Sequence, residues 1–227
     1  MKILSRDSLP LGGFAGLTEH RLVTDSRVFG VHKHPMSAEG LGGFVYLADA
    51  RFNPLGETTM HPHKEIDVIS VMIEGRVSHE GSLEHGKSLD TGDVQVQRAG
   101  GEGFAHNEVN PDTEKNRMIQ LWVLPETAGE PAGYKYYSPA SEGKTRIYGG
   151  DEESTFISKT SIDIVNVPAG KQVKINDSSL SYLTAGIGRV TSGVDQAEIK
   201  DGDLIKGEDL QVDAQENISM IVISHNS

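Results

Sequence analysis

The chain has no cysteine, few aromatic residues and no long apolar run. Without cysteine, disulfide bonds, thiolate metal ligands and thiol nucleophiles are all excluded. No stretch approaches the roughly 18 apolar residues of a membrane-spanning helix. The N-terminus becomes charged and glycine-rich too early for the apolar segment of a signal peptide. The sequence therefore predicts a cytoplasmic protein.

Positive charge is also scarce. The chain has 21 Lys and Arg residues against 33 Asp and Glu residues, which gives a net charge of −12. This sign repels nucleic acid backbones and anionic membrane surfaces. We therefore expect no direct binding to nucleic acid and no membrane association. The composition is compatible both with a small-molecule substrate and with a protein partner.

Short β-branched segments recur through the 227 residues, separated by Gly, Pro, Asn and Asp. The clearest of them span residues 44–49, 66–73, 94–97, 103–109, 117–124, 162–167 and 219–224. Short strands at regular spacing with turn residues between them are typical of an all-β sandwich or barrel. The sequence therefore predicts an all-β fold with few short helices.

The second half of the chain repeats three short motifs of the first half in the same order. The pairs have offsets of 114, 113 and 110 residues and are Pro54-Leu55-Gly56 with Pro168-Ala169-Gly170, Gly75-Arg76-Val77 with Gly188-Arg189-Val190, and Gly92-Asp93 with Gly202-Asp203. Internal repeats of this kind indicate duplicated structural units. We infer two tandem jelly-roll barrels or sandwiches. The first occupies residues 1–125, a linker residues 126–150, and the second residues 151–227.

Two pairs of potential metal ligands lie about forty residues apart, in the first copy only. His61 and His63 form one pair, and His106 and Glu108 form the other. Side chains at i and i+2 of a strand point to the same face, so two facing strands would direct all four groups to one point. Imidazole with carboxylate suits Fe(II), Mn(II), Ni(II), Cu(II) or Zn(II) rather than calcium or magnesium.

The second copy lacks such a set. Counting from the repeated glycines places Lys174 and Asn176 opposite the first pair, and Glu216 and Ile218 opposite the second. No histidine lies between His106 and His225. The sequence therefore predicts a C-terminal barrel without a metal site.

These motifs resemble the two sequence boxes of the cupin superfamily. The segments 61–65, 74–75, 92–95 and 101–108 are similar to pirin, and more specifically to the short bacterial YhaK branch of pirin-like proteins. The resemblance implies a bicupin whose N-terminal barrel holds one metal, usually iron. It maps the ligands to His61, His63, His106 and Glu108.

The resemblance also implies a function, because some pirins resemble quercetin 2,3-dioxygenases. We therefore expect a metal-dependent oxidoreductase that uses O2 on a small phenolic or enolic substrate, with Glu108 as a candidate base. Glu65 and Asp67 share strand parity with the first histidine pair and are candidates for hydrogen bonds to the ligating imidazoles. Two alternatives stay open. One is a binding or regulatory module, redox-related or otherwise, with an empty or structural metal site. The other is a metal-assisted isomerase or a sugar-acid-binding cupin.

Overall fold

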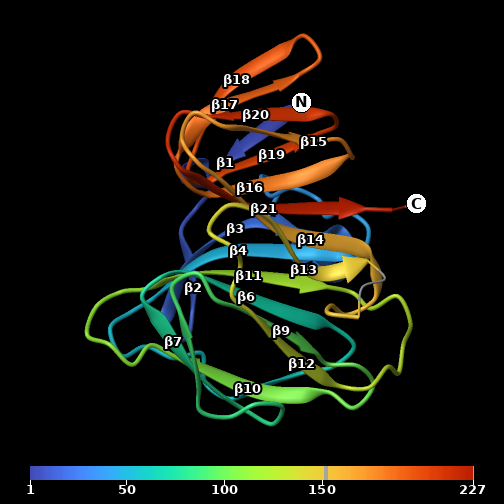
Figure 1. The fold of residues 1–227 in the computed structure, drawn as a ribbon. Helices are drawn as coiled ribbons and strands as arrows, with labels where there is room; N and C mark the ends of the chain where they lie inside the picture. The colour runs from blue at the N-terminus through green and yellow to red at the C-terminus, as the bar shows by residue number, and fades with distance from the viewer. Residues whose placement is uncertain (151–152, 227) are drawn as a thin grey trace. The chain divides into compact units, whose positions relative to one another are not determined.

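The computed structural model describes residues 1–150 and 153–226. It is built almost entirely from strands, which confirms the predicted all-β class (Figure 1). The chain forms two compact units. The N-terminal barrel comprises Leu9–Ser138, and the C-terminal barrel comprises Met1–Ser8 together with Pro139–Ser227. No helix among the described residues has the length and apolar character that crossing a membrane would need.

The N-terminal barrel consists of two sheets. Its strands are β2 (Gly12–Phe14), β3 (Leu17–Thr24), β4 (Phe44–Phe52), β5 (His61–His63), β6 (Asp67–Glu74), β7 (Arg76–Gly81), β8 (Lys87–Asp90), β9 (Val94–Arg98), β10 (Phe104–Val109), β11 (Arg117–Val123) and β12 (Gly133–Tyr137). The larger sheet has the order β12-β9-β6-β11-β4-β3-β2, and the smaller has the order β5-β10-β7-β8. Between β3 and β4 the chain forms two single turns, α1 (Ser26–Phe29) and η2 (Gly30–His32).

The C-terminal barrel is also made of two sheets. Its strands are β1 (Lys2–Ser5), β13 (Gly143–Gly150), β14 (Ser158–Val167), β15 (Gln172–Ile175), β16 (Ser179–Ala185), β17 (Ile187–Ser192), β18 (Asp195–Lys200), β19 (Asp203–Gly207), β20 (Leu210–Ala214) and β21 (Ile218–His225). One sheet has the order β1-β19-β16-β21-β14-β13, and the other has the order β15-β20-β17-β18. The 3-10 turn η1 (Arg6–Ser8) follows β1.

The two barrels share one topology. The order β9-β6-β11-β4 in the first corresponds to β19-β16-β21-β14 in the second, and β5-β10-β7-β8 corresponds to β15-β20-β17-β18. Eight consecutive strands of each unit therefore occupy equivalent places, as two copies of a jelly roll require. This equivalence confirms the two tandem jelly rolls expected from the repeated motifs.

The domain boundaries differ from those expected. Residues 1–125 do not form one unit, because β1 pairs with β19 and so belongs to the C-terminal barrel. The expected linker 126–150 contains β12, which pairs with β9, and β13, which pairs with β14. An edge strand joins a sheet through its backbone groups, so its side chains do not reveal which sheet it extends. The start of the expected second domain, residues 151–152, lies outside the described residues.

The interiors of the two barrels differ in polarity. In the C-terminal barrel, one core cluster contains the inward residues Val165, Leu183, Ile205 and Met220. In the N-terminal barrel, Ser70 lies on β6 between Val68 and Met72, which belong to two different core clusters. Ser70 is fully buried, as are Gln95, Gln97, His79, His106 and Glu108. Buried polar groups need partners, so this polar interior marks the N-terminal barrel as the unit that carries a site.

Candidate metal centre

The two ligand pairs lie on neighbouring strands. Strand β5 pairs antiparallel with β10, so that His61 is opposite His106 and His63 is opposite Phe104. Strand β5 is the edge of its sheet, where the missing N–H of Pro62 disrupts no ladder. Pro62 is exposed while both neighbouring histidines are partly buried, so strand alternation directs both imidazoles to the face opposite Pro62.

Three imidazoles converge at one point. Nε2 of His106 lies 3.1 Å from Nε2 of His61 and 3.2 Å from Nε2 of His63. Two nitrogens bound at right angles to one first-row ion, at about 2.1 Å each, would lie about 3.0 Å apart. Among the described residues, these three histidines form a group whose ligand atoms all lie within 4.8 Å of one another. The spacing therefore fits a shared metal ion.

The tautomer of the neutral His61 imidazole follows from its backbone contact. Its Nδ1 lies 2.8 Å from the carbonyl oxygen of Thr59, and a carbonyl can only accept. Nδ1 therefore carries the proton, and Nε2 directs its lone pair toward the other two histidines. In the tautomers in which His63 and His106 also direct lone pairs to this point, the three nitrogens repel one another unless a cation lies between them. The donor set is consequently suited to a metal ion.

Burial keeps two of the histidines neutral. It lowers the pKa of His63 to about 4, and the neighbouring His61 adds to this effect. Burial lowers the pKa of His106 to about 2, with smaller contributions from His63, His61 and His79. Metal binding needs neutral imidazole, so protons do not compete for these ligands near pH 7.

Glu108 lies outside the histidine group of the described residues. It is fully buried, and its Oε1 accepts from Ser70 Oγ at 2.7 Å and from Gln95 Nε2 at 3.0 Å. Its Oε2 accepts from Gln120 Nε2 at 3.4 Å. Burial raises the pKa of Glu108 to about 7, although these three hydrogen bonds oppose the rise. The structure thus places Glu108 on the strand of His106, in a separate polar cluster.

Glu65 and Asp67 make contacts other than the hydrogen bonds to imidazole that were expected of them. Oε1 of Glu65 accepts from the backbone N–H of Gly129 at 3.0 Å. Oδ2 of Asp67 accepts from Arg98 Nε at 3.2 Å, and the pair is buried. Neither contact reaches a histidine, so both carboxylates stabilise the surrounding loops and strands.

Ser70 and Gln95, the two closest side-chain partners of Glu108, were not among the site residues predicted from the sequence. Each interrupts a β-branched run at an inward position, Ser70 between Ile69 and Val71 and Gln95 between Val94 and Val96. Polar residues at the inward parity of a buried strand were the signal that could have found them.

An aromatic cluster borders the histidines. The rings of Trp122 and Tyr46 stack with centroids 4.3 Å apart, and Phe29 stacks on the same pair. The His63 ring meets Trp122 edge to face at 6.0 Å. The site therefore has a flat, largely apolar neighbour on the side of His63.

The second barrel places different residues at the equivalent strands, β15 and β20. Lys174 lies on β15 as expected, but Glu216 and Ile218 fall beyond the end of β20. The prediction for the second pair was wrong because only two residues separate β19 from β20, whereas five separate β9 from β10. Strand β20 carries Gln211 and Asp213 instead. Neither equivalent strand has a histidine, and the described part of this barrel contains no group of potential metal ligands like that of the first.

Comparisons with known proteins agree with this architecture. The Pirin family model matches residues 24–123. A Pseudomonas aeruginosa protein whose name assigns it provisionally as a quercetin 2,3-dioxygenase is 28% identical over 174 residues, 72% of this chain and 75% of that protein.

Solved structures show the same fold over the whole chain. Escherichia coli YhhW, a bacterial pirin in complex with nickel(II), has a TM-score of 0.83 at 17% identity and covers 100% of this chain and 99% of its own. Escherichia coli YhaK has a TM-score of 0.67 at 12% identity, with 83% and 87% covered. The similarity in fold is therefore greater to YhhW than to the YhaK branch expected from the sequence. The family match over residues 24–123, the relatives and the paired jelly rolls together support a pirin-like bicupin.

Proposed function

We propose that this protein is a metal-dependent dioxygenase that acts on a flat phenolic or enolic substrate such as a flavonol. The convergence of three imidazole Nε2 atoms at 3.1 and 3.2 Å is the observation that carries the proposal. The provisional name of the Pseudomonas aeruginosa relative supports the reaction class. We propose Fe(II) as the metal, with Ni(II), Mn(II), Cu(II) and Zn(II) as alternatives. A bound ion of this kind would supply Lewis acidity and a common place for substrate and O2.

The residues of the chain would prepare the substrate. The stacked rings of Trp122 and Tyr46 offer a flat surface beside His63 for an aromatic ring system. Glu108, with a pKa raised to about 7 by burial, can accept the proton of a substrate hydroxyl near neutral pH. Ser70, Gln95 and Gln120 hold its carboxylate in one orientation.

Oxygen uptake tests the proposal directly. The full-length protein, loaded with Fe(II) or Ni(II), should consume O2 when quercetin is added, and His61→Ala should abolish this uptake. His85→Ala is the matched control, because His85 is an exposed histidine of the same barrel and lies outside the group. Tight metal binding without any flavonol-dependent O2 uptake would contradict the enzyme and favour a binding or regulatory module.

A separate variant tests the role of Glu108. We propose that its carboxylate serves the site either as a fourth ligand or as the proton acceptor. A Glu108→Gln variant that binds Ni(II) about ten times more weakly indicates a ligand. A variant with unchanged affinity and a slower turnover that no longer varies with pH near 7 indicates a base. Trp122 is the single tryptophan of the chain and lies 6.0 Å from His63, so quenching of its emission by Ni(II) gives the affinity.

A further inference from the structure

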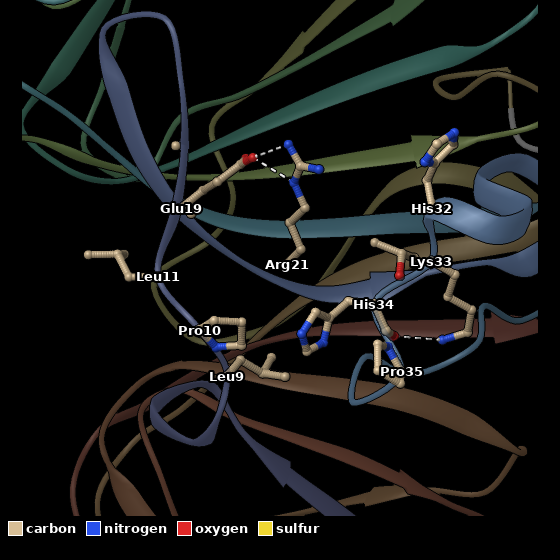
Figure 2. A pocket seen from close by; sticks show the side chains of 12 residues that line it. Leu9, Pro10, Leu11, Glu19, Arg21, His32, Lys33, His34 and Pro35 are labelled. Carbon is tan, nitrogen blue, oxygen red and sulfur yellow. Dashed lines mark hydrogen bonds and ion pairs between the residues drawn. The ribbon is translucent and has the colours of Figure 1, made fainter.

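A cavity lies in the N-terminal barrel, and no ligand of the candidate metal centre lines it. Its volume is 380 Å³. The lining residues all come from the segment before β4 and are Leu9, Pro10, Leu11, Gly12, Gly13, Glu19, Arg21, Thr24, His32, Lys33, His34 and Pro35 (Figure 2). Pockets for small molecules usually measure about 300–1,000 Å³, so this cavity is large enough for a small ligand.

The cavity has one apolar side and one polar side. Figure 2 shows Leu9, Pro10 and Pro35 gathered on one side and the paired Glu19 and Arg21 on the other. Leu11 also lines the cavity and is 62% exposed, which places an apolar side chain at the solvent edge. A ligand here would bury an apolar body and direct a polar group toward Arg21.

On the polar side of the cavity, the carboxylate oxygens of Glu19 already accept hydrogen bonds from other side chains. Oε1 of Glu19 accepts from Arg21 Nε at 2.7 Å, and its Oε2 accepts from the Tyr46 hydroxyl at 3.0 Å. Glu19 is buried, so both contacts satisfy a carboxylate that water does not reach. The cavity therefore has no need of a donor from its ligand at this position.

Two lining side chains keep a donor for a ligand. Arg21 contacts Glu19 through Nε and Nη2 and also forms a hydrogen bond with Tyr46, but a guanidinium has five N–H donors and these contacts do not use all of them. His34 accepts the backbone N–H of Met36 at Nδ1, at 3.3 Å, so its proton lies on Nε2, which has no partner among the described residues. Both side chains line the cavity. Together they fit a ligand group that only accepts hydrogen bonds.

The charge of the lining favours an anion. Arg21 and Lys33 are cationic, whereas Glu19 is the one carboxylate among the lining residues. Nζ of Lys33 is held by the carbonyl oxygen of Ser37 at 2.7 Å and its hydroxyl at 3.2 Å. Lys33 therefore adds a fixed positive charge rather than a mobile side chain. Glu39, which does not line the cavity, pairs with Lys33 at 3.7 Å, so the excess of positive charge is confined to the lining residues.

We propose that this cavity binds a small carboxylate with an apolar body, as a site separate from the histidines. The carboxylate accepts from Arg21 and His34, and the apolar body packs against Leu9, Pro10 and Leu11. Binding does not depend on the proposed dioxygenase activity, because none of these residues contacts His61, His63 or His106 among the contacts that the structure records.

The proposed carboxylate site is connected to the aromatic cluster through Tyr46. The Tyr46 hydroxyl, which donates to Glu19, belongs to the ring stacked 4.3 Å from Trp122. A carboxylate that draws the Arg21 guanidinium toward itself weakens the Arg21–Glu19 pair and changes the electric field at Tyr46 and Trp122. Occupancy of the cavity therefore changes the emission of the only tryptophan in the chain.

Benzoate is a suitable probe, and benzyl alcohol is its neutral counterpart. Calorimetric titration of the full-length protein should show saturable benzoate binding at one site, with the same affinity in His61→Ala. Arg21→Gln should weaken binding at least about tenfold, since a charge-assisted hydrogen bond is lost. Arg189→Gln is the matched control, because Arg189 is also 47% exposed and paired with one glutamate, but lies in the other barrel.

A second variant keeps the test valid if Arg21→Gln fails to fold. Leu11→Glu adds a negative charge at the exposed edge and should weaken benzoate binding about tenfold, whereas Leu11→Gln should leave it within about twofold. Equal affinity for benzoate and benzyl alcohol, or no saturable benzoate binding up to millimolar concentrations, would overturn the site. Saturating benzoate that leaves the Trp122 emission unchanged would overturn the connection to the aromatic cluster.

Discussion

The Nδ1 atom of His61 lies 2.8 Å from the carbonyl oxygen of Thr59, two residues earlier. Thr59 has a φ of 63°, in the left-handed region that a β-branched residue rarely adopts. The contact fixes the tautomer that leaves Nε2 available to a metal, and the left-handed conformation of Thr59 sets how the preceding chain leads into it. Strained backbone next to a site is a recurrent way of holding a side chain in its working orientation.

Replacing Thr59 tests this relationship. Thr59→Pro forces φ to a negative value, moves the carbonyl and should weaken Ni(II) binding about 10–100-fold, as the loss of a partner to a ligating histidine does. Thr59→Gly adopts the same φ without strain and should bind Ni(II) as the wild type does. Quenching of Trp122 emission measures both affinities. Similar affinities in the two variants would show that the Thr59 carbonyl does not orient His61.

The sequence predicted the elements that depend on local pattern. The pair His61 and His63 shares one face because alternate strand residues do, and the repeated glycine motifs predicted the paired jelly rolls. The sequence could not predict that β1 pairs with β19, because edge pairing uses backbone groups. Nor could strand parity give the distance from Glu108 to the histidines, which depends on side chains from three other strands, Ser70, Gln95 and Gln120.

Burial of His63 predicts how the stability of the metal-free protein varies with pH. Its folded-state pKa of about 4 lies below the ordinary value of 6.5. Between these two pH values, the unfolded chain therefore binds a proton that the folded state does not bind. Stability should therefore fall as pH falls from 6.5 toward 4, and the contribution is fully present above 6.5. Between pH 6.5 and 4.5, the wild type should lose about 1–2 kcal/mol more than His63→Gln.

Chemical denaturation at several pH values, with a chelator present, measures this difference. The exposed His85→Gln variant is the control for loss of an imidazole as such. Its pH dependence should match that of the wild type. If His63→Gln showed the same slope as the wild type, burial of His63 would not be a source of acid sensitivity.

Glu108 predicts the opposite dependence on pH. Its folded-state pKa, raised to about 7 by burial, exceeds the ordinary value of 4.5, so the folded state binds the proton more readily than the unfolded chain. The metal-free protein should lose stability as pH rises from 4.5 to 7, where the unfolded chain has released the proton and the folded state still holds it. At pH 8, Glu108→Gln should be more stable than the wild type by about 2–3 kcal/mol, and the two should converge near pH 5. Denaturation curves that stay parallel from pH 5 to pH 8 would refute this.

The close packing of Gly103 against the backbone of His63 should make metal affinity sensitive to substitution of this glycine. It has a φ of 78°, and a Cβ added there would lie 2.8 Å from the carbonyl oxygen of His63. Gly103→Ala should therefore cost about 1–2 kcal/mol of stability from the backbone conformation and displace His63 as well. Ni(II) affinity should fall about tenfold, because ligand nitrogens must stay within a few tenths of an ångström of their positions.

Gly92 provides the matched control for Gly103. Its φ is 93°, and a Cβ added there meets nothing within 4 Å. Gly92→Ala should lose similar stability and bind Ni(II) with wild-type affinity, because it carries the same type of backbone strain far from any ligand. Thermal denaturation of the metal-free variants gives the stability, and quenching of Trp122 emission gives the affinity. If Gly92→Ala and Gly103→Ala bound Ni(II) equally well, the His63 imidazole would be positioned by its contacts with Phe104 and Trp122 rather than by the backbone of β5.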